Sequence, residues 1–284
     1  MITTIGIIGS GTMGSGIAEV GAVAGFNVKL NDVSQSALDS AMKRIRQNLD
    51  RGVEKKRMAA HDAAHAFARI KASSNFDDLA PSTFVVEAAL EDMSVKREIF
   101  QKLDSLLSPE TILATNTSSL SVTAIAELVN RPEKVVGMHF FNPPPLMKLV
   151  EVVKGKQTSP HTLDLTLDIA RRMRKTPVVC NDTPGFIVNR VARPFYLEAL
   201  RLLGEGVATV EQIDSIVKLG GGFKMGPFEL MDLIGIDVNY AVTKSVYAQF
   251  SEAPRFEPHP IQQQMVEAGT LGRKTKKGFY SYDK

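Results

Sequence analysis

Residues 4–24 read TIGIIGSGTMGSGIAEVGAVA, and this stretch predicts the fold of the N-terminal part of the chain. Its first part, Thr4–Ile8, is short, rich in β-branched residues and followed by a glycine, which is typical of a buried parallel strand. The glycines of residues 9–14 then have the GxGxxG spacing, and residues 15–24 form a helix-favouring run. A GxGxxG motif that follows a strand and opens a helix indicates a dinucleotide-binding unit.

The residues of this motif have separate predicted roles in binding the cofactor. Gly9 permits a tight turn, Gly11 lets the backbone approach a pyrophosphate, and Gly14 allows the helix to pack closely on the strand. Thr12 and Met13 open the helix, whose N–H groups and positive dipole end favour phosphate binding. We therefore predict that these five residues bind the dinucleotide.

An acid follows the next predicted strand. Residues 27–30 lead to Asp32, which lies about twenty residues past the glycines, where an acid can bind the 2′-hydroxyl of a ribose. Because Asp32 would repel a 2′-phosphate, NAD is favoured over NADP. The alternative interpretation is that Asp32 caps a helix that begins near Ser34, and both roles are compatible.

Strands alternate with helices over most of residues 1–183. This alternation predicts a Rossmann-type, doubly wound, mostly parallel sheet, with ligands at the carboxyl ends of its strands. Asp32, Glu87, Glu91, His139 and the polar cluster at residues 116–118, which includes Ser118, are expected along that rim. Beyond the first two strands, the predicted strands are residues 69–73, 83–88, 111–115, 134–140, 148–153 and 177–180, and the clearest amphipathic helix is residues 92–107.

The segment from His139 to Glu151 places an imidazole and a carboxylate on either side of three prolines, residues 143–145. Proline fixes φ and cannot donate to a ladder, so this segment is predicted as an exposed, stiff corner. A histidine with a nearby acid to orient it is a plausible proton-transfer pair. The alternative is that His139, which is followed by two phenylalanines, is a packed structural residue; its expected place on the rim favours the functional interpretation.

The strand pattern stops after residue 183, and residues 184–284 are predicted as an all-helical domain with helices at 186–203, 210–219 and 227–250. We expect the active site in the cleft between the domains. Asn189 is expected to face that cleft, unless it is a polar surface residue. The apolar helices also predict a homodimer through this domain, in which residues 228, 230, 231, 233 and 234 are contacts rather than core.

Composition narrows the classes of function. The chain of 284 residues has a net charge of +3, too small and too dispersed to indicate a nucleic-acid partner. No apolar run is long enough to span a membrane, and the N-terminus carries no charged leader, so a cytoplasmic protein is expected. The single Cys180 fits a reducing compartment and excludes a zinc cluster of cysteines, and we predict no metal site.

The basic run at residues 55–57 is either a solvated face or a site for the phosphates of a large anionic substrate.

Taken together, these motifs resemble the L-3-hydroxyacyl-CoA dehydrogenases over essentially the whole chain, and most of all the bacterial 3-hydroxybutyryl-CoA dehydrogenases. The resemblance implies NAD-dependent, reversible oxidation of (S)-3-hydroxyacyl-CoA to 3-ketoacyl-CoA by a homodimer. The segments that carry it are GSGTMG at residues 9–14, NTSSL at 116–120, HFFNP at 139–143, KLVEVV at 148–153, DTPGFIVNR at 182–190 and GRKTKKGFY at 272–280.

The resemblance also implies roles for single residues. By it, His139 is the catalytic base, Glu151 orients the base, and Ser118 and Asn189 bind the substrate oxygen and order the site. The family's contacts with the nicotinamide half of NAD fall on Glu91, Lys96, Ser118 and Asn142, and its contacts with the acyl-CoA on Ser118, Lys55 and Asn48. Two residues depart from the pattern: Asn48 replaces a serine of some relatives, and Lys276 stands where the motif commonly has glycine.

Two other functions are possible for a chain with this motif. A related dehydrogenase of a free hydroxy acid or a sugar acid would have no obvious use for the basic run at residues 55–57. A non-catalytic, crystallin-like NAD-binding protein would not need His139, Glu151, Ser118 and Asn189 together.

Overall fold

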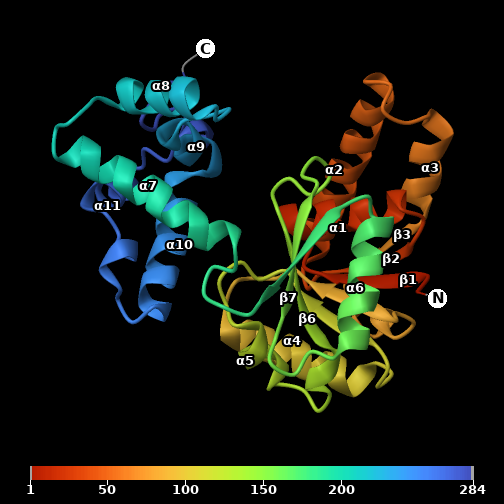
Figure 1. The fold of residues 1–284 in the computed structure, drawn as a ribbon. Coiled ribbons are helices and arrows are strands. Elements are labelled where there is room, and N and C mark those ends of the chain that lie inside the picture. The colour runs from red at the N-terminus through yellow and green to blue at the C-terminus, as the bar shows by residue number, and fades with distance from the viewer. Residues whose placement is uncertain (1, 283–284) are drawn as a thin grey trace. The chain divides into compact units, whose positions relative to one another are not determined.

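The computed structural model describes residues 2–282, which form two compact units that meet between Thr183 and Pro184 in the chain (Figure 1). Each unit has its own apolar core. Among residues 2–282, no helix is long and apolar enough to cross a membrane.

The first unit is built on one eight-stranded sheet with the strand order β3-β2-β1-β4-β5-β6-β7-β8. Every neighbouring pair is parallel except β6 and β7. These two strands are joined by the proline corner alone, and a short connection suits an antiparallel pair, whereas parallel strands need a crossover. The predicted mostly parallel, doubly wound sheet is therefore confirmed. The strands are β1 Thr4–Ile8, β2 Asn27–Asn31, β3 Ile70–Ser73, β4 Phe84–Glu87, β5 Ile112–Thr115, β6 Val135–Phe140, β7 Leu149–Lys154 and β8 Thr176–Asn181.

Helices cover the sheet of the first unit (Figure 1). Their side chains share the main core with alternate residues of the strands. Ile5 and Ile7 of β1, for example, pack in this core with α1, α2, α3 and α6. Because side chains alternate between faces along a strand, Glu87, His139 and Glu151 point to the other face. The helices are α1 Thr12–Val23, α2 Gln35–Glu54, α3 Ala60–Ala68, α4 Met93–Leu106, α5 Val122–Ala126 and α6 Pro160–Arg172, with short 3₁₀ turns η1 Phe76–Leu79 and η2 Pro132–Lys134.

Over the described residues of the second unit the helices are its main elements, as predicted, with only isolated β-bridges near its end, but one predicted helix has the wrong bounds. Residues 227–250 form two helices that meet at Gly235. The φ of Gly235 is 102°, which lies far outside the α-helical region and therefore ends the first helix. The helices are α7 Val188–Gly204, α8 Val210–Gly221, α9 Pro227–Ile234, α10 Ile236–Gln249 and α11 Pro260–Glu267, with 3₁₀ turns η3 Pro254–Phe256 and η4 Arg273–Thr275.

The residues predicted as dimer contacts divide between core and surface. Phe228 and Met231 are wholly buried in the core of the second unit, so these two are not surface contacts, whereas Leu230 is half-buried and packs against that core. Leu233 and Ile234, at the end of α9, remain exposed. The prediction treated the whole of α9 as one face, but an eight-residue helix turns its apolar stripe inward and leaves its last turn outside.

Candidate active site

The glycine motif forms the turn between β1 and α1. Gly9 has a φ of 91°, and a Cβ there would lie 2.5 Å from the carbonyl oxygen of Ala88, so the turn requires glycine. A Cβ on Gly14 would lie 1.7 Å from the carbonyl oxygen of Gly9, which explains the close packing of α1. A Cβ on Gly11 would meet no protein atom within 4 Å. Packing therefore accounts for Gly9 and Gly14 but not for Gly11, which borders open space, as a residue that faces a ligand would.

Asp32 lies directly after β2 and binds the same turn. Its Oδ2 accepts hydrogen bonds from the backbone N–H and the hydroxyl of Ser10, at 2.7 and 2.8 Å, and its Oδ1 accepts one from the N–H of Ser34 at 3.0 Å. Partial burial raises the pKa of the Asp32 carboxyl, but these hydrogen bonds outweigh burial and lower it overall. Ser34, not Asp32, caps α2 by accepting a bond from Ala37. Asp32 is therefore an anion held beside the glycine turn.

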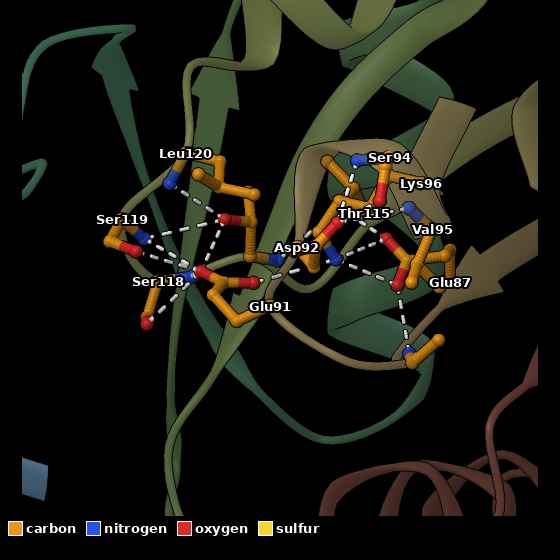
Figure 2. A network of polar contacts seen from close by, with 12 residues as sticks. Glu87, Glu91, Asp92, Ser94, Val95, Lys96, Thr115, Ser118, Ser119 and Leu120 are labelled. Atoms are coloured by element: carbon orange, nitrogen blue, oxygen red, sulfur yellow. Dashed lines mark hydrogen bonds and ion pairs between the residues drawn. The ribbon is translucent and has the colours of Figure 1, made fainter.

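Glu91 holds the turn that contains Ser118 (Figure 2). Its Oε1 accepts hydrogen bonds from the N–H of Ser118 at 2.8 Å, the N–H of Ser119 at 3.0 Å and the hydroxyl of Thr117 at 2.6 Å. Partial burial raises the pKa of the Glu91 carboxyl, but the charge of Lys96 and these hydrogen bonds lower it overall. Polar residues that precede a helix often cap it, but the hydroxyls of residues 116–119 do not, because Ser121 caps α5. The cluster binds Glu91 instead.

Lys96 lies behind Glu91 and is almost wholly buried, with 1% of its surface exposed. Its ammonium group donates to both oxygens of Glu87, at 2.7 and 2.8 Å, and lies 3.4 Å from Oε2 of Glu91 (Figure 2). Glu87 also accepts bonds from the hydroxyl of Thr115 and the N–H of Ala89. Glu87 is thus paired with Lys96, a contact that the sequence does not predict. Lys96 reaches the rim through Glu91, and its direct contact with a cofactor stays a prediction.

His139 and Glu151 lie directly opposite each other on the antiparallel strands β6 and β7. Nδ1 of His139 lies 2.8 Å from Oε2 of Glu151, and only 6% and 1% of the two residues are exposed. The ring of His139 also contacts the ring of Phe141, with centroids 4.7 Å apart. The expectation that the acid lies next to the imidazole is thus confirmed, and the pairing results from the register of the two strands.

The proline corner between these strands is less exposed than predicted. Asn142 and Pro143 are exposed and joined by a cis peptide bond, but Pro144 is buried. Pro144 packs on Gly16 of α1, where a Cβ would lie 2.8 Å from the proline ring. The ammonium group of Lys175 donates to the carbonyl oxygens of Pro144 and Met147. The corner is therefore stiff because it is anchored to α1 and to the start of β8, as well as because of its prolines.

A pocket of about 460 Å³ lies between α1, α2 and the proline corner. Asn48 and Lys55, the two residues predicted to contact an acyl-CoA, both line it, and Asn48 donates to Glu19 at 2.9 Å. The pocket's cationic side chains are Arg51, Lys55, Arg57, Lys148, Arg174 and Lys175. A lining with so many cationic side chains suits an anionic ligand that carries phosphates. The basic run at residues 55–57 thus contributes two side chains to a cavity.

Asn189 lies in the first turn of α7, in the second unit, and is half-buried. Its role beside Ser118 stays a prediction. Cys180, on β8, is also half-buried, and burial raises the pKa of its thiol to about 12. A thiol with so high a pKa is a poor nucleophile near neutral pH. Among residues 2–282, no cluster of three or more histidine, cysteine or acidic side chains could hold a metal ion.

Both units of the chain match known protein families. Residues 4–183 match the family described as "3-hydroxyacyl-CoA dehydrogenase, NAD binding domain", and residues 185–282 match its C-terminal domain. A 3-hydroxybutyryl-CoA dehydrogenase of Clostridioides difficile is 44% identical over 99% of both chains.

Two solved structures resemble the fold over the full length of the chain. The (S)-3-hydroxybutyryl-CoA dehydrogenase of Ralstonia eutropha is 42% identical, with a TM-score of 0.96 over 100% of both chains. The 3-hydroxybutyryl-CoA dehydrogenase of Escherichia coli K12 is 46% identical, with a TM-score of 0.97; the match covers all of this chain and 60% of that longer one.

Proposed function

The chain belongs to the 3-hydroxyacyl-CoA dehydrogenase family, and we propose that it oxidises (S)-3-hydroxybutyryl-CoA to acetoacetyl-CoA with His139 as the base. Membership of the family makes it an NAD-dependent oxidoreductase of 3-hydroxyacyl-CoA esters. The four-carbon substrate is our proposal, supported by the names of the relatives from Clostridioides difficile and Ralstonia eutropha. The observation that carries the mechanism is the buried pair of His139 and Glu151.

The residues around the β1–α1 turn fit the dinucleotide. Gly11 borders open space at the start of α1, where N–H groups would hold the pyrophosphate. Asp32 is an ionised acceptor beside this turn and would bind the 2′-hydroxyl of the adenosine ribose. NAD supplies a nicotinamide ring that accepts the hydride from C3 of the substrate.

His139 would accept the proton of the substrate's 3-hydroxyl group. Its Nδ1 is engaged by Glu151, so Nε2 is the atom that would act as the base. A carboxylate at Nδ1 keeps the proton there, which leaves the lone pair on Nε2, and it stabilises the imidazolium that forms. In the reverse reaction the imidazolium returns the proton from Nε2 to the 3-keto oxygen.

Ser118 and Asn142 would order the reacting groups. Glu91 binds the backbone of Ser118 and its neighbour, so the position of the Ser118 hydroxyl depends on a carboxylate that Lys96 in turn stabilises. We assign this hydroxyl to the substrate oxygen, together with Asn189. Asn142 is exposed at the anchored corner, which supports a contact with the nicotinamide half of the cofactor.

The pocket beside the corner is assigned to the CoA part of the substrate. Six cationic side chains and the amide of Asn48 line it, and a CoA ester carries a diphosphate and a 3′-phosphate. Lys55 and Asn48 would contact these groups. A free hydroxy acid has no phosphates and would leave this pocket without a function.

We also propose that the protein is a homodimer joined through the second unit. Support comes from large apolar side chains on the surface of that unit, above all Leu219, which is 87% exposed. Val191, Ile216 and Phe223 are exposed as well. Sedimentation equilibrium of the wild-type protein tests the proposal, because a mass of one chain at micromolar concentration would contradict it.

A spectrophotometric assay tests the proposed substrate. NADH absorbance is followed with acetoacetyl-CoA, with acetoacetate and with longer 3-ketoacyl-CoA esters. We expect rapid loss of NADH with acetoacetyl-CoA, slower loss with long chains and none with acetoacetate. Turnover of acetoacetate alone would indicate a dehydrogenase of free acids, and absence of turnover with every CoA ester would refute the proposed function.

A further inference from the structure

A buried carboxyl group forms part of the pocket and takes no part in the proton transfer at His139. Glu19, on α1, is only 6% exposed, and its Oε2 accepts a hydrogen bond from the amide of Asn48 at 2.9 Å. An acid buried beside a site for an anionic ligand weakens binding when it is ionised, because like charges repel. The pocket therefore binds an anion well only when the carboxyl group of Glu19 is neutral or its charge is offset.

The cationic side chains around Glu19 differ in how strongly they can offset the negative charge of its ionised carboxyl group. Of the described residues that line the pocket, Glu19 is the one carboxylate. The charge of Lys175 is the main favourable one, but its ammonium group is already bound by the carbonyl oxygens of Pro144 and Met147. The other cations of the lining are Arg51, Lys55 and Arg57 from α2 and the turn after it, Lys148 from the corner, and Arg174 from the turn before β8.

Burial decides the protonation of Glu19. Burial raises the pKa of its carboxyl group, while the hydrogen bond from Asn48 and the charge of Lys175 lower it by less, and the result is a pKa of about 7. The free protein near neutral pH is thus a mixture of the ionised and the protonated forms. A second anion placed in the pocket shifts this mixture toward the protonated form.

We propose that Glu19 controls the affinity of the pocket for CoA esters, because its carboxyl group takes up a proton when the ester binds. The affinity for the ester then falls as the pH rises through neutrality, since each binding event must recruit a proton. This inference rests on the proposed function, because it requires the pocket to hold the CoA part of the substrate.

Calorimetric titration with butyryl-CoA tests the inference without catalysis, since this ester lacks the 3-oxygen and cannot react. Wild type and Glu19→Gln are compared from about pH 6 to about pH 8.5, in pairs of buffers with different ionisation enthalpies. Glutamine keeps an oxygen acceptor for Asn48. We expect the wild-type Kd to rise roughly five- to tenfold over this range, and that of the variant to change less than about twofold.

Two controls separate Glu19 from other titrating groups. Glu98→Gln removes the same charge from an exposed position on α4, outside the pocket lining, and should keep the wild-type pH profile. Dephospho-CoA lacks the 3′-phosphate, whose own titration near pH 6 also changes the number of protons exchanged on binding. With this ligand, wild type should still take up a fraction of a proton and Glu19→Gln should not.

A second measurement needs no variant. The ¹³C signal of the Glu19 carboxyl group is followed against pH with and without saturating butyryl-CoA, and its midpoint must move upward with the ligand. An unmoved midpoint, or equal pH profiles in wild type and Glu19→Gln, would overturn the role of Glu19. Absence of butyryl-CoA binding at every pH, with no turnover of acetoacetyl-CoA, would instead refute the proposed function itself.

Discussion

Replacement of Glu151 by glutamine removes one charge from the buried pair and leaves its size unchanged. In the structure, Oε2 of Glu151 lies 2.8 Å from Nδ1 of His139, and 1% of Glu151 is exposed. A hydrogen bond to a charged group contributes about 1.5–3 kcal/mol, and it would stabilise the imidazolium that forms during proton transfer. Since each ~1.4 kcal/mol is about a factor of ten in rate, this loss alone lowers kcat roughly tenfold to hundredfold.

The tautomer adds to this loss. If the glutamine turns its NH₂ group toward His139, Nδ1 must accept, and the ring proton moves to Nε2, where the base needs its lone pair. The corresponding amide substitution in a serine protease triad lowers kcat by about 10⁴, so we expect a decrease between about 10² and 10⁴ here.

The assay is the initial rate of NADH formation with NAD and saturating (S)-3-hydroxybutyryl-CoA, in which His139 acts as the base, and binding of NADH is measured separately by its fluorescence. We expect kcat to fall while the Kd for NADH stays close to that of wild type. Glu133→Gln, at an exposed glutamate of η2, is the matched control and should keep the wild-type rate. A kcat of Glu151→Gln within about threefold of wild type would refute the orienting role, because even one lost charge-assisted bond costs more.

Three other changes test separate parts of the structure. Asp32→Asn should raise the Kd for NAD and reduce the preference for NAD over NADP; an unchanged preference, measured from the two Kd values, would contradict the assignment. Lys276 has a left-handed φ of 59°, so Lys276→Gly should raise the free energy of unfolding in urea by about 0.5–1 kcal/mol, and a loss of stability would count against this reasoning. The pKa of Glu19 is raised from 4.5 to about 7, so the stability of the wild type falls as the pH rises between these values. Glu19→Gln should therefore be more stable than wild type at pH 8, by at most ~3 kcal/mol, with no such gain near pH 4.5; equal differences at both pH values would contradict the shift.

Local sequence signals were sufficient to predict the sheet and the glycine turn. The strands are short, apolar and β-branched, and the turn needs a positive φ at Gly9 and close packing at Gly14, so single residues carry both signals. The imidazole–carboxylate pair was also predictable, because a short corner joins strands that must then lie side by side.

Contacts between segments that are distant in the chain could not be predicted from local sequence patterns. Glu87 pairs with Lys96 because the end of β4 and the first turns of α4 meet behind Glu91, and nothing in either segment alone indicates that pairing. Pro144 is buried because Gly16, on α1, leaves room for its ring.

The break between α9 and α10 at Gly235 also depends on tertiary contacts, so the local sequence does not predict it. An apolar helical pattern continues on both sides of this glycine, and one glycine inside a helix costs only about 1 kcal/mol. The break is held by tertiary contacts, since the N–H of Ile236 donates to the carbonyl oxygen of Leu271 in the C-terminal segment.

The most direct test of the central claim is the single-turnover rate of NADH oxidation by acetoacetyl-CoA in His139→Ala, because hydride transfer to C3 is coupled to the proton that His139 supplies in this direction. General acid–base catalysis by one side chain contributes about 10²- to 10⁴-fold, so we expect a rate constant lower by that factor, with NADH still bound. His161→Ala, at an exposed position on α6, should react as fast as wild type. A His139→Ala variant that also reacts at the wild-type rate would contradict the assignment of His139 as the base.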